Sequence, residues 1–311
     1  MSDTDLPVVW LLGPTAVGKS QVALQLAEHI PVELVSVDST QVYRGLDVGS
    51  AKPSTAERAQ VTHHLIDIRD PADPYSAAHF VADAEQAIAD IHQRGRIPLL
   101  VGGTMLYFKA LKEGLAKLPA ASPQVRARLT REAEARGWDA LHRSLAEVDP
   151  ETAARTPPGN RQRVLRALEV HALTGTPLSV HHSRQGAPPA RPWKVHQFGL
   201  TPPDRTGLHR AIERRLNAML DAGLIAEVRG LQQRPDLHLG LPALRSVGYR
   251  QAWEHLDGAL GFDAMKSKAL AATRQLAKRQ LTWMRTWPDL QTLPIEAPAA
   301  VALQIRAQLP I

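Results

Sequence analysis

The sequence contains no cysteine, and this absence removes several chemistries at once. Disulfide bonds, thiol nucleophiles, iron–sulfur clusters and cysteine-ligated zinc are all excluded. The sequence also lacks a long hydrophobic stretch, because its longest uncharged apolar run, residues 6–17, is broken by Pro and Gly and is too short to span a bilayer. The first five residues hold two Asp and no basic residue, unlike a secretory or organellar signal. We therefore expect a cytoplasmic protein with no membrane contact.

The composition that is present suits a soluble globular protein. The chain has 311 residues, of which 44% are hydrophobic and 22% charged, enough for one large domain or two ordinary ones. The net charge of +6 is unevenly placed: residues 1–121 carry 10 Lys and Arg against 14 Asp and Glu, and residues 122–215 carry 16 against 9. A polarised charge of this kind suggests that a polyanion docks on one side, although a merely basic surface would give the same composition.

The pattern along the chain predicts an α/β fold. Short apolar runs at 8–12, 32–37 and 97–101 alternate with helical periodicity at 20–29 and 77–93, which is typical of a parallel sheet. Other segments follow: helices at 122–136, 138–147 and 161–173, a linker at 185–192, a strand at 195–200, and helices at 208–222, 223–233 and 265–287. We expect a P-loop parallel sheet flanked by helices (1–117 and 193–311, including C-terminal helices) with a helical insertion domain at 118–192.

One motif identifies a phosphate site. It has the form G-x-x-x-x-G-K-[ST], lies between the first strand and the first helix, and consists of Gly13, Pro14, Thr15, Ala16, Val17, Gly18, Lys19 and Ser20. Glycines let such a loop turn its backbone N–H groups toward phosphate oxygens, and the helix N-terminus adds positive potential. Lys19 would reach the outer phosphates and Ser20 would ligate Mg²⁺. The motif predicts a diphosphate or triphosphate ligand but not the reaction.

Polar residues also follow the next two strands. Asp38 ends the second strand, where it can serve the metal, act as a general base, or simply cap the following turn. Thr104, after two glycines at the end of the third strand, offers a hydroxyl to a substrate or caps the next helix. Both belong to the carboxyl edge of the sheet, where α/β proteins bind ligands. Asp67 and Asp70 are rival carboxylates whose neighbours look more like an ion-pair network.

Basic residues cluster in three places. On a helix over 271–287, Arg274, Lys278 and Arg285 fall within about 40° of one another, with Gln275 and Arg279 beside them, opposite an apolar arc. Arg161, Arg163 and Arg166 form a second cluster, and residues 245–250 a third, in which Tyr249 could stack on a base. A solvated face explains any one cluster, but three of them favour RNA. His181 and His182 lack convergent ligands and are interpreted as a loop.

Together these residues resemble the tRNA dimethylallyltransferase family, the bacterial tRNA isopentenyltransferases, over nearly the whole chain. The matching stretches are GPTAVGKS (13–20), DSTQVYRGLDVGSAKP (38–53), GGTMLY (102–107), QRVLRALE (162–169), SVGYRQ (246–251) and TRQLAKRQLTWMR (273–285). The stretches at 38–53 and 273–285 are far more specific than the P-loop.

The resemblance implies transfer of the dimethylallyl group from dimethylallyl diphosphate to N6 of an adenosine beside the anticodon. The P-loop and Mg²⁺ would hold the diphosphate as the leaving group, so a nucleotide such as ATP would not be hydrolysed. By the family pattern Asp38 is the base, and Thr104 and Arg215 contact the reacting region; the arginine often found just before Ile212 is Ala211 here, with Arg210 shifted by one.

The resemblance also implies a tRNA anticodon stem-loop as partner of a chain that we expect to be monomeric. The residues that would contact it are Asp38, Ser39, Thr40, Gln41, Thr104, Arg126, Gln162, Arg163, Val164, Leu165, Arg166, Arg245, Ser246, Val247, Gly248, Tyr249, Arg250, Lys278, Arg279, Gln280, Leu281, Thr282, Trp283, Met284 and Arg285.

Three other functions fit part of the sequence. A small-molecule P-loop kinase leaves the basic clusters unexplained. An adenylate isopentenyltransferase acting on AMP or ADP needs neither the Arg-rich insertion nor the basic helix at 273–285. A non-catalytic RNA-binding P-loop protein gives Asp38 and Thr104 no role.

Overall fold

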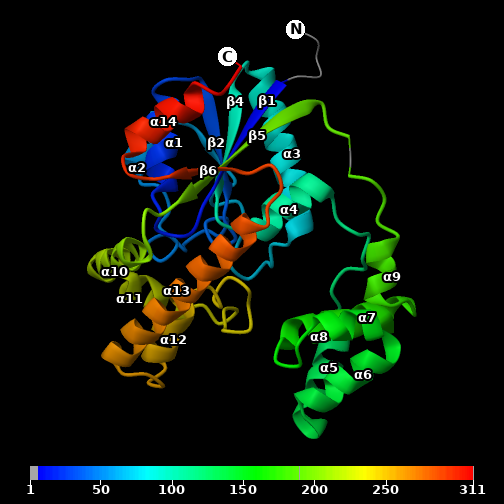
Figure 1. Ribbon diagram of the computed structural model, residues 1–311. Helices are drawn as coiled ribbons and strands as arrows, with labels where there is room; N and C mark the ends of the chain where they lie inside the picture. The colour runs from blue at the N-terminus through cyan, green and yellow to red at the C-terminus, as the bar shows by residue number, and fades with distance from the viewer. Residues whose placement is uncertain (1–5, 189, 311) are drawn as a thin grey trace. The chain divides into compact units, whose positions relative to one another are not determined.

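The computed structural model describes residues 6–188 and 190–310, and its centre is a six-stranded sheet in which every pairing is parallel (Figure 1). The strand order is β3-β2-β4-β1-β5-β6. The strands are β1 (Leu6–Leu12), β2 (Val32–Val37), β3 (His63–His64), β4 (Ile97–Gly102), β5 (Trp193–Thr201) and β6 (Gln291–Pro294). The predicted fold class is confirmed.

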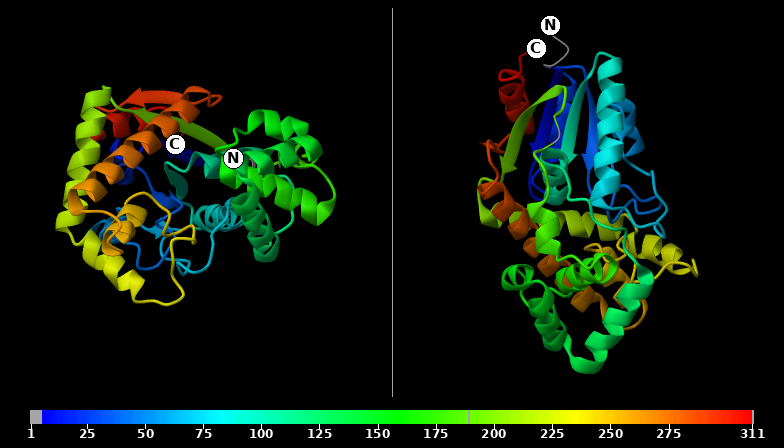
Figure 2. Two further views of the ribbon diagram at one scale, coloured as in Figure 1. Left: turned by 90° about the horizontal axis from the view of Figure 1, so that it is seen from below. Right: turned by 90° about the vertical axis from the view of Figure 1, so that its right-hand side faces the viewer.

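Helices cover both faces of the sheet because its central strands are apolar on both sides. On one face α1 (Lys19–Ala27) and α14 (Pro298–Arg306) pack together over a core that includes Val9, Leu11 and Ile305. On the other, α3 (Ala77–Gln93) and α4 (Met105–Glu113) cover a larger core containing Trp10 and Phe108. Figure 2 shows the sheet between these two layers.

A group of helices gathers at the carboxyl end of the sheet within the same compact unit (Figure 1). They are α10 (Arg205–Asp221), α11 (Leu224–Gln232), α12 (Tyr249–Leu256) and α13 (Phe262–Arg285). α13 packs on α10 and α12 along its length. Because the carboxyl ends of the strands point into this group, its inward side chains form one wall of the site described below.

Contacts between Cα atoms divide the chain into two compact units: residues 1–111 with 190–311, and residues 112–189. The described part of the second unit, residues 112–188, has helices and no strand, and these helices pack on their own core around Leu141, Leu145 and Val164. They are α5 (Pro123–Arg136), α6 (Trp138–Val148), α7 (Pro150–Arg155), α8 (Arg161–Thr174) and α9 (Leu178–Ser183). A helical insertion was expected at 118–192, and its contact with tRNA stays a prediction.

Most expected elements form within a few residues of their predicted bounds, but the short ones were missed. These are α2 (Thr55–Gln60), β3, α4, α7, α9, α12, β6 and α14. Such elements give too few turns or alternations for periodicity to show. Among the described residues, no helix is long and apolar enough to cross a bilayer.

Candidate active site

The carboxyl edge of the sheet brings together three loops that lie far apart in the sequence. β4 lies between β1 and β2, and its last residue, Gly102, is in register with both Leu12 and Val37. The loops that follow these strands therefore leave the sheet at the same level. As predicted from the sequence, the P-loop, Asp38 and Thr104 meet at this edge.

The P-loop has the backbone form that an anion site requires. Gly18 has φ 101° and Ala16 has φ 64°, so two residues of the loop lie in the left-handed region. Alternation of right- and left-handed residues turns successive N–H groups toward one point. α1 begins at Lys19, and the first N–H groups of a helix have no intrahelical acceptor. This end of α1 can therefore bind a phosphate group.

Two cations and one carboxylate interact inside this site. Nζ of Lys19 donates to the carbonyl oxygens of Gly13 at 2.9 Å and Pro14 at 2.8 Å. Burial, with the charge of Arg215, lowers the pKa of Lys19 to about 7, while Asp38 opposes this shift. Burial also lowers the pKa of Arg215, and Asp38 again opposes it. Two cations balanced by a single carboxylate make a site suited to a further anion.

Asp38 caps a turn with one of its two carboxylate oxygens. Its Oδ1 accepts the backbone N–H of Thr40 at 2.8 Å and of Gln41 at 3.3 Å, which confirms the capping role that the sequence left open. Within the described chain, Oδ2 of Asp38 has no hydrogen-bond partner, so this oxygen remains available to a substrate proton. The cap holds the carboxylate in place without consuming both of its oxygens.

Thr104 is tied to the same turn. Its Oγ1 accepts the backbone N–H of Ser39 at 3.2 Å, joining the loop after β4 to the loop after β2. The two strands approach so closely at this point that a Cβ on Gly102 would collide with the carbonyl oxygen of Val37. Glycine at 102 is therefore required for Thr104 to lie beside Asp38.

A cavity of about 430 Å³ joins the predicted catalytic and phosphate residues. Lys19, Ser20, Asp38, Thr104 and Arg215 all line it. Its apolar lining residues include Leu24, Ile212, Leu216, Met219, Leu276 and Trp283. The cavity thus combines a cationic anion site, a carboxylate and an apolar wall, as a ligand with a charged head and a hydrocarbon tail requires.

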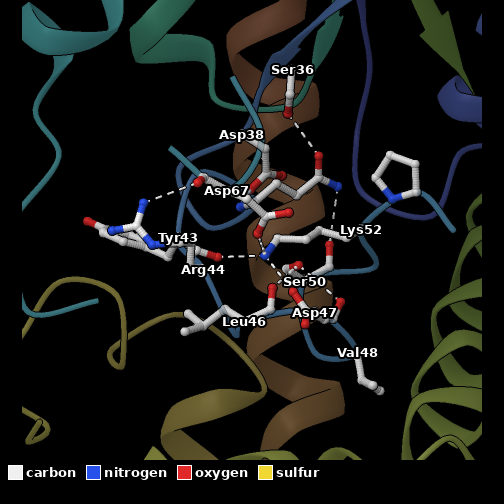
Figure 3. Close-up of polar contacts among 12 residues, drawn as sticks. Ser36, Asp38, Tyr43, Arg44, Leu46, Asp47, Val48, Ser50, Lys52 and Asp67 are labelled. Carbon is white, nitrogen blue, oxygen red and sulfur yellow. Dashed lines mark hydrogen bonds and ion pairs between the residues drawn. The ribbon is translucent and has the colours of Figure 1, made fainter. Parts of the chain in front are cut away.

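Sequence reasoning gave no role to Lys52, although it lies in one of the specific motifs. Figure 3 shows its ammonium inside the loop: the side chain is 3% exposed, and Nζ donates to the Tyr43 carbonyl at 2.6 Å and to carboxylate oxygens of Asp47 at 2.6 Å and Asp67 at 2.5 Å. Arg58 also pairs with Asp67. A buried lysine among three acceptors fixes the fold of the loop, and the expected ion-pair role of Asp67 is confirmed.

This loop forms part of the cavity wall. The side-chain amide of Gln41 donates to the carbonyl oxygens of Ser50 and Ala51, and its oxygen accepts the hydroxyl of Ser36. Gly49, Ser50 and Ala51 line the cavity. Asp70, the other rival carboxylate, is bound by both terminal nitrogens of Arg234, which confirms that it too belongs to an ion-pair network.

Many residues expected to meet RNA are exposed. On α13 these include Lys278, Arg279, Thr282 and Arg285. A groove on this helix is lined by Gln275, Lys278, Arg279, Thr282 and Trp283. Arg245, Arg250, Gln162 and Arg163 are exposed as well. Arg274 is less accessible than the stripe predicted, because its Nε is buried.

Several other residues in that set require correction. Tyr249 is 0% exposed and its hydroxyl donates to Glu227, so the expectation that its ring stacks on a base is wrong. Val164 and Met284 are buried in hydrophobic cores, so their side chains cannot contact RNA. Gln280 is also buried, at 7% exposed, and binds inward. Inward and outward positions alternate within a few residues of a helix, so whole motif stretches cannot face one way.

Within the insertion, Arg126 is engaged by an internal carboxylate. Its Nε and one terminal nitrogen contact the two oxygens of Glu169 at 3.0 and 3.1 Å, and Arg166 contacts the same carboxylate at 2.8 Å. Glu169 is 0% exposed and accepts the backbone N–H of Ser122 as well. The side chain of Arg126 remains 41% exposed, so it is held in place but accessible.

The fold and this cavity define a P-loop α/β protein in which the anion-binding loop and a carboxylate line one cavity. Comparison with known proteins then gives the family: the model described as IPP transferase matches residues 41–287. The chain belongs to the IPP transferase family, and the family predicted from the sequence is confirmed.

Named relatives match nearly the full length. A tRNA dimethylallyltransferase of Bordetella pertussis is 54% identical, covering 98% of this chain and 97% of its own, and one of Thioalkalivibrio sulfidiphilus is 52% identical, covering 97% and 95%. A solved tRNA isopentenylpyrophosphate transferase of Bacillus halodurans has TM-score 0.69 and 35% identity, covering 97% of this chain and 96% of its own. A eukaryotic dimethylallyltransferase acting on tRNA has TM-score 0.75 and 26% identity, covering 93% and 74%.

Proposed function

We propose that this chain is a cytoplasmic enzyme that transfers the dimethylallyl group of dimethylallyl diphosphate to N6 of an adenosine beside the anticodon of tRNA. The observation that carries the proposal is the shared cavity, in which Lys19, Ser20 and Arg215 lie with Asp38 and an apolar wall. The names of the full-length relatives support the same reaction. A P-loop kinase acting on a small molecule would leave the exposed cations of α13 without a role.

The proposed chemistry is a substitution at the first carbon of the dimethylallyl group. The bond from this carbon to the diphosphate oxygen breaks, the bond to N6 forms, and Asp38 accepts the N6 proton. Lys19, Arg215 and the N–H groups at the start of α1 stabilise the negative charge of the departing diphosphate. To act as the general base, Asp38 must come within hydrogen-bond distance of the N6 amine. Its Oδ2 can do so when the adenine enters the cavity.

Mg²⁺ fits the site as a partner of the diphosphate. Ser20 lines the cavity, so its hydroxyl, a hard oxygen donor, is available to the ion. No group of three or more His, Asp or Glu side chains among the described residues could hold a metal without substrate. Mg²⁺ bound by one or two protein oxygens, water and substrate phosphates is the usual arrangement, and it supplies charge neutralisation at the diphosphate.

The ligand of the cavity is therefore the prenyl donor, and the second substrate is RNA. The groove that carries the exposed cations of α13 adjoins the cavity, because Arg279 and Trp283 line both. A phosphate backbone along Lys278 and Arg285 would place a nucleotide near the opening. A base reaches Asp38 only if it leaves its stack, as enzymes that modify bases require.

Mass spectrometry of an anticodon stem-loop tests the proposal. The RNA is incubated with the full chain, Mg²⁺ and dimethylallyl diphosphate. Two parallel reactions replace the RNA by AMP or ADP, or replace dimethylallyl diphosphate by ATP. We expect a five-carbon gain on one adenosine of the RNA and none on the free nucleotides. Prenylation of AMP or ADP but not RNA, or RNA-independent ATP hydrolysis without any prenyl gain, would refute the proposal.

A further inference from the structure

Gln280 lies on the inner side of the helix whose outer side carries the basic stripe. Its neighbours Lys278 and Arg279 are exposed, whereas Gln280 is 7% exposed. A buried side-chain amide must satisfy both its donor and its acceptor, or its burial destabilises the fold. The partners that it finds are not on its own helix.

Both partners belong to the loops of the active site. The side-chain oxygen of Gln280 accepts the backbone N–H of Thr15 at 2.8 Å, and its nitrogen donates to the carbonyl oxygen of Gly103 at 2.9 Å. The amide therefore bridges the P-loop after β1 and the loop after β4. These contacts link segments separated by 265 and 177 residues.

The packing around this bridge is tight. A Cβ on Gly103 would collide with the side-chain nitrogen of Gln280 and would lie 3.2 Å from the carbonyl oxygen of Gly13. The glycine thus allows the amide to enter between the two loops. A side chain that fits so closely transmits its position to both backbones, because packed interiors have little free space.

The bridge also leaves the phosphate-binding part of the P-loop free. Thr15 lies in the first half of the loop, where Lys19 already binds the carbonyl oxygens of Gly13 and Pro14. The N–H groups at the start of α1 lie in the other half and keep their capacity for an anion. Gly103 immediately precedes Thr104, so the same amide sets the distance between the diphosphate loop and the hydroxyl that is bound to the Asp38 turn.

We propose that Gln280 is a positioning residue that holds the P-loop against the Gly103 loop, so that α13 helps to form the diphosphate site as well as the RNA face. The inference rests on the proposed function for its substrate. It replaces the direct RNA contact that the sequence predicted for Gln280. It also implies that the diphosphate affinity and the RNA affinity respond differently to a change at this residue.

The first test separates these two affinities. Gln280→Leu keeps the approximate size of the side chain but removes both hydrogen bonds. Each buried bond to a backbone group is worth about one factor of ten in an equilibrium, so we expect the KM for dimethylallyl diphosphate and the Kd for inorganic pyrophosphate with Mg²⁺ to rise about tenfold or more. The Kd for the anticodon stem-loop should change less than about twofold, because the side chain is buried beneath the RNA face.

A matched control distinguishes positioning from a general loss of stability. Ile91→Ala removes a fully buried side chain of α3, close to the start of β4 and thus at the end of the sheet opposite the cavity. This variant should lower the Tm while the KM for dimethylallyl diphosphate stays at its wild-type value. An unchanged KM and pyrophosphate Kd in Gln280→Leu, or a weaker RNA Kd alone, would overturn the proposal. Absence of transfer by the wild-type chain would instead refute the proposed function.

Gln280→Glu adds a pH-dependent test. A protonated carboxyl can accept from Thr15 and donate to Gly103, as the amide does, whereas the ionised form can only accept. The ratio of kcat/KM for Gln280→Glu to that of the wild type should therefore rise as the pH falls, and the corresponding ratio for Gln280→Leu should stay flat. Parallel profiles for Gln280→Glu and the wild type would show that the bridge does not act as proposed.

Discussion

Tyr249 donates its hydroxyl to Oε1 of Glu227 at 2.5 Å, and the same carboxylate accepts three successive backbone N–H groups of the cavity-wall loop. Those groups belong to Asp47, Val48 and Gly49. The Tyr249 ring lies against the loop so closely that a Cβ on Gly49 would be 2.6 Å from it. Burial, with Glu227, raises the pKa of Tyr249, so its hydroxyl remains a donor over the working pH range. The motif at 246–251 thus stabilises, through Tyr249 and Glu227, the loop that forms part of the cavity wall.

We expect graded losses of stability when this carboxylate cluster is altered. Glu227→Ala leaves three N–H groups without their charged acceptor and should lower the free energy of unfolding by about 3 kcal/mol. Glu227→Gln keeps one acceptor oxygen and should cost less, and Tyr249→Phe, which removes one donor, should cost least. Urea unfolding of the three variants measures this order. Glu227→Ala with wild-type stability would show that the cluster does not hold the loop.

The affinity for diphosphate should decrease as the pH rises above neutrality. Burial and Arg215 lower the pKa of Lys19 to about 7, and a bound anion must raise it. Binding above that pKa therefore takes up a proton, and the affinity should fall by up to about tenfold per pH unit between about pH 7 and 9. Asp38, the third charged group at this ammonium, opposes the shift without removing it.

Calorimetry of pyrophosphate binding with Mg²⁺, in buffers of different ionisation enthalpy, measures the net proton uptake, and the excess of the wild type over Lys19→Arg is the part that Lys19 takes up. Lys19→Arg serves as the comparison, because a guanidinium stays charged throughout this range. Its affinity should depend less on pH, whatever its absolute value. Equal pH dependence in the two proteins, with no proton uptake by the wild type, would contradict the assignment.

Glu169 should stabilise the insertion through Arg126 and Arg166. Burial opposes ionisation of this carboxylate, but hydrogen bonds from both arginines and from Ser122 hold its pKa below the ordinary value of 4.5. Its contribution is therefore present above about pH 4.5 and is lost as the pH falls through the lowered pKa. Glu169→Gln should reduce the free energy of opening of α5 and α8 by about 2 kcal/mol at neutral pH.

Hydrogen exchange of the α5 and α8 amides tests this effect while the rest of the chain serves as the internal reference. The exchange rates of β1 and β4 should not change. If the α5 and α8 amides of Glu169→Gln kept wild-type protection, the carboxylate would not be the central contact of the insertion.

Removal of two exposed cations from α13 should reduce RNA binding and its dependence on salt. Lys278→Gln combined with Arg285→Gln removes two phosphate partners, so the slope of log K against log salt should fall by about 1.5. Arg306→Gln, on the exposed side of α14, is the control and should leave the slope unchanged. Filter binding of the stem-loop at several salt concentrations suffices. An unchanged slope in the double variant would place the RNA elsewhere.

The sequence predicted those parts of the site that depend on local motifs. The P-loop, Asp38 and Thr104 each follow a recognisable buried strand, and parallel strands necessarily end at one edge. Arg215 came from the family resemblance, and its place in the cavity fits that assignment. The three loops could be grouped from the sequence because chain direction and strand pairing alone bring them together.

Other parts depend on contacts that no local pattern encodes. Glu227 lies outside every motif, and its role follows only from the packing of α11 against a loop nearly 180 residues away. Tyr249 was placed on the RNA side because aromatic residues near arginines often stack on bases, but the ring is needed in the core. Gln280 was predicted to contact RNA together with its neighbours. The sequence of a helix does not show which of its polar side chains has a buried hydrogen-bond partner elsewhere in the chain.

The central claim is that Asp38 removes the N6 proton beside a diphosphate held by the P-loop, and a single-turnover measurement tests it most directly. Asp38→Asn keeps an oxygen for the N–H of Thr40 but loses the base. With RNA and dimethylallyl diphosphate both saturating, the rate of prenyl transfer should fall by about 10² to 10⁴. The Kd for pyrophosphate should not weaken, because a negative charge has been removed. Transfer by Asp38→Asn at the wild-type rate would contradict the account.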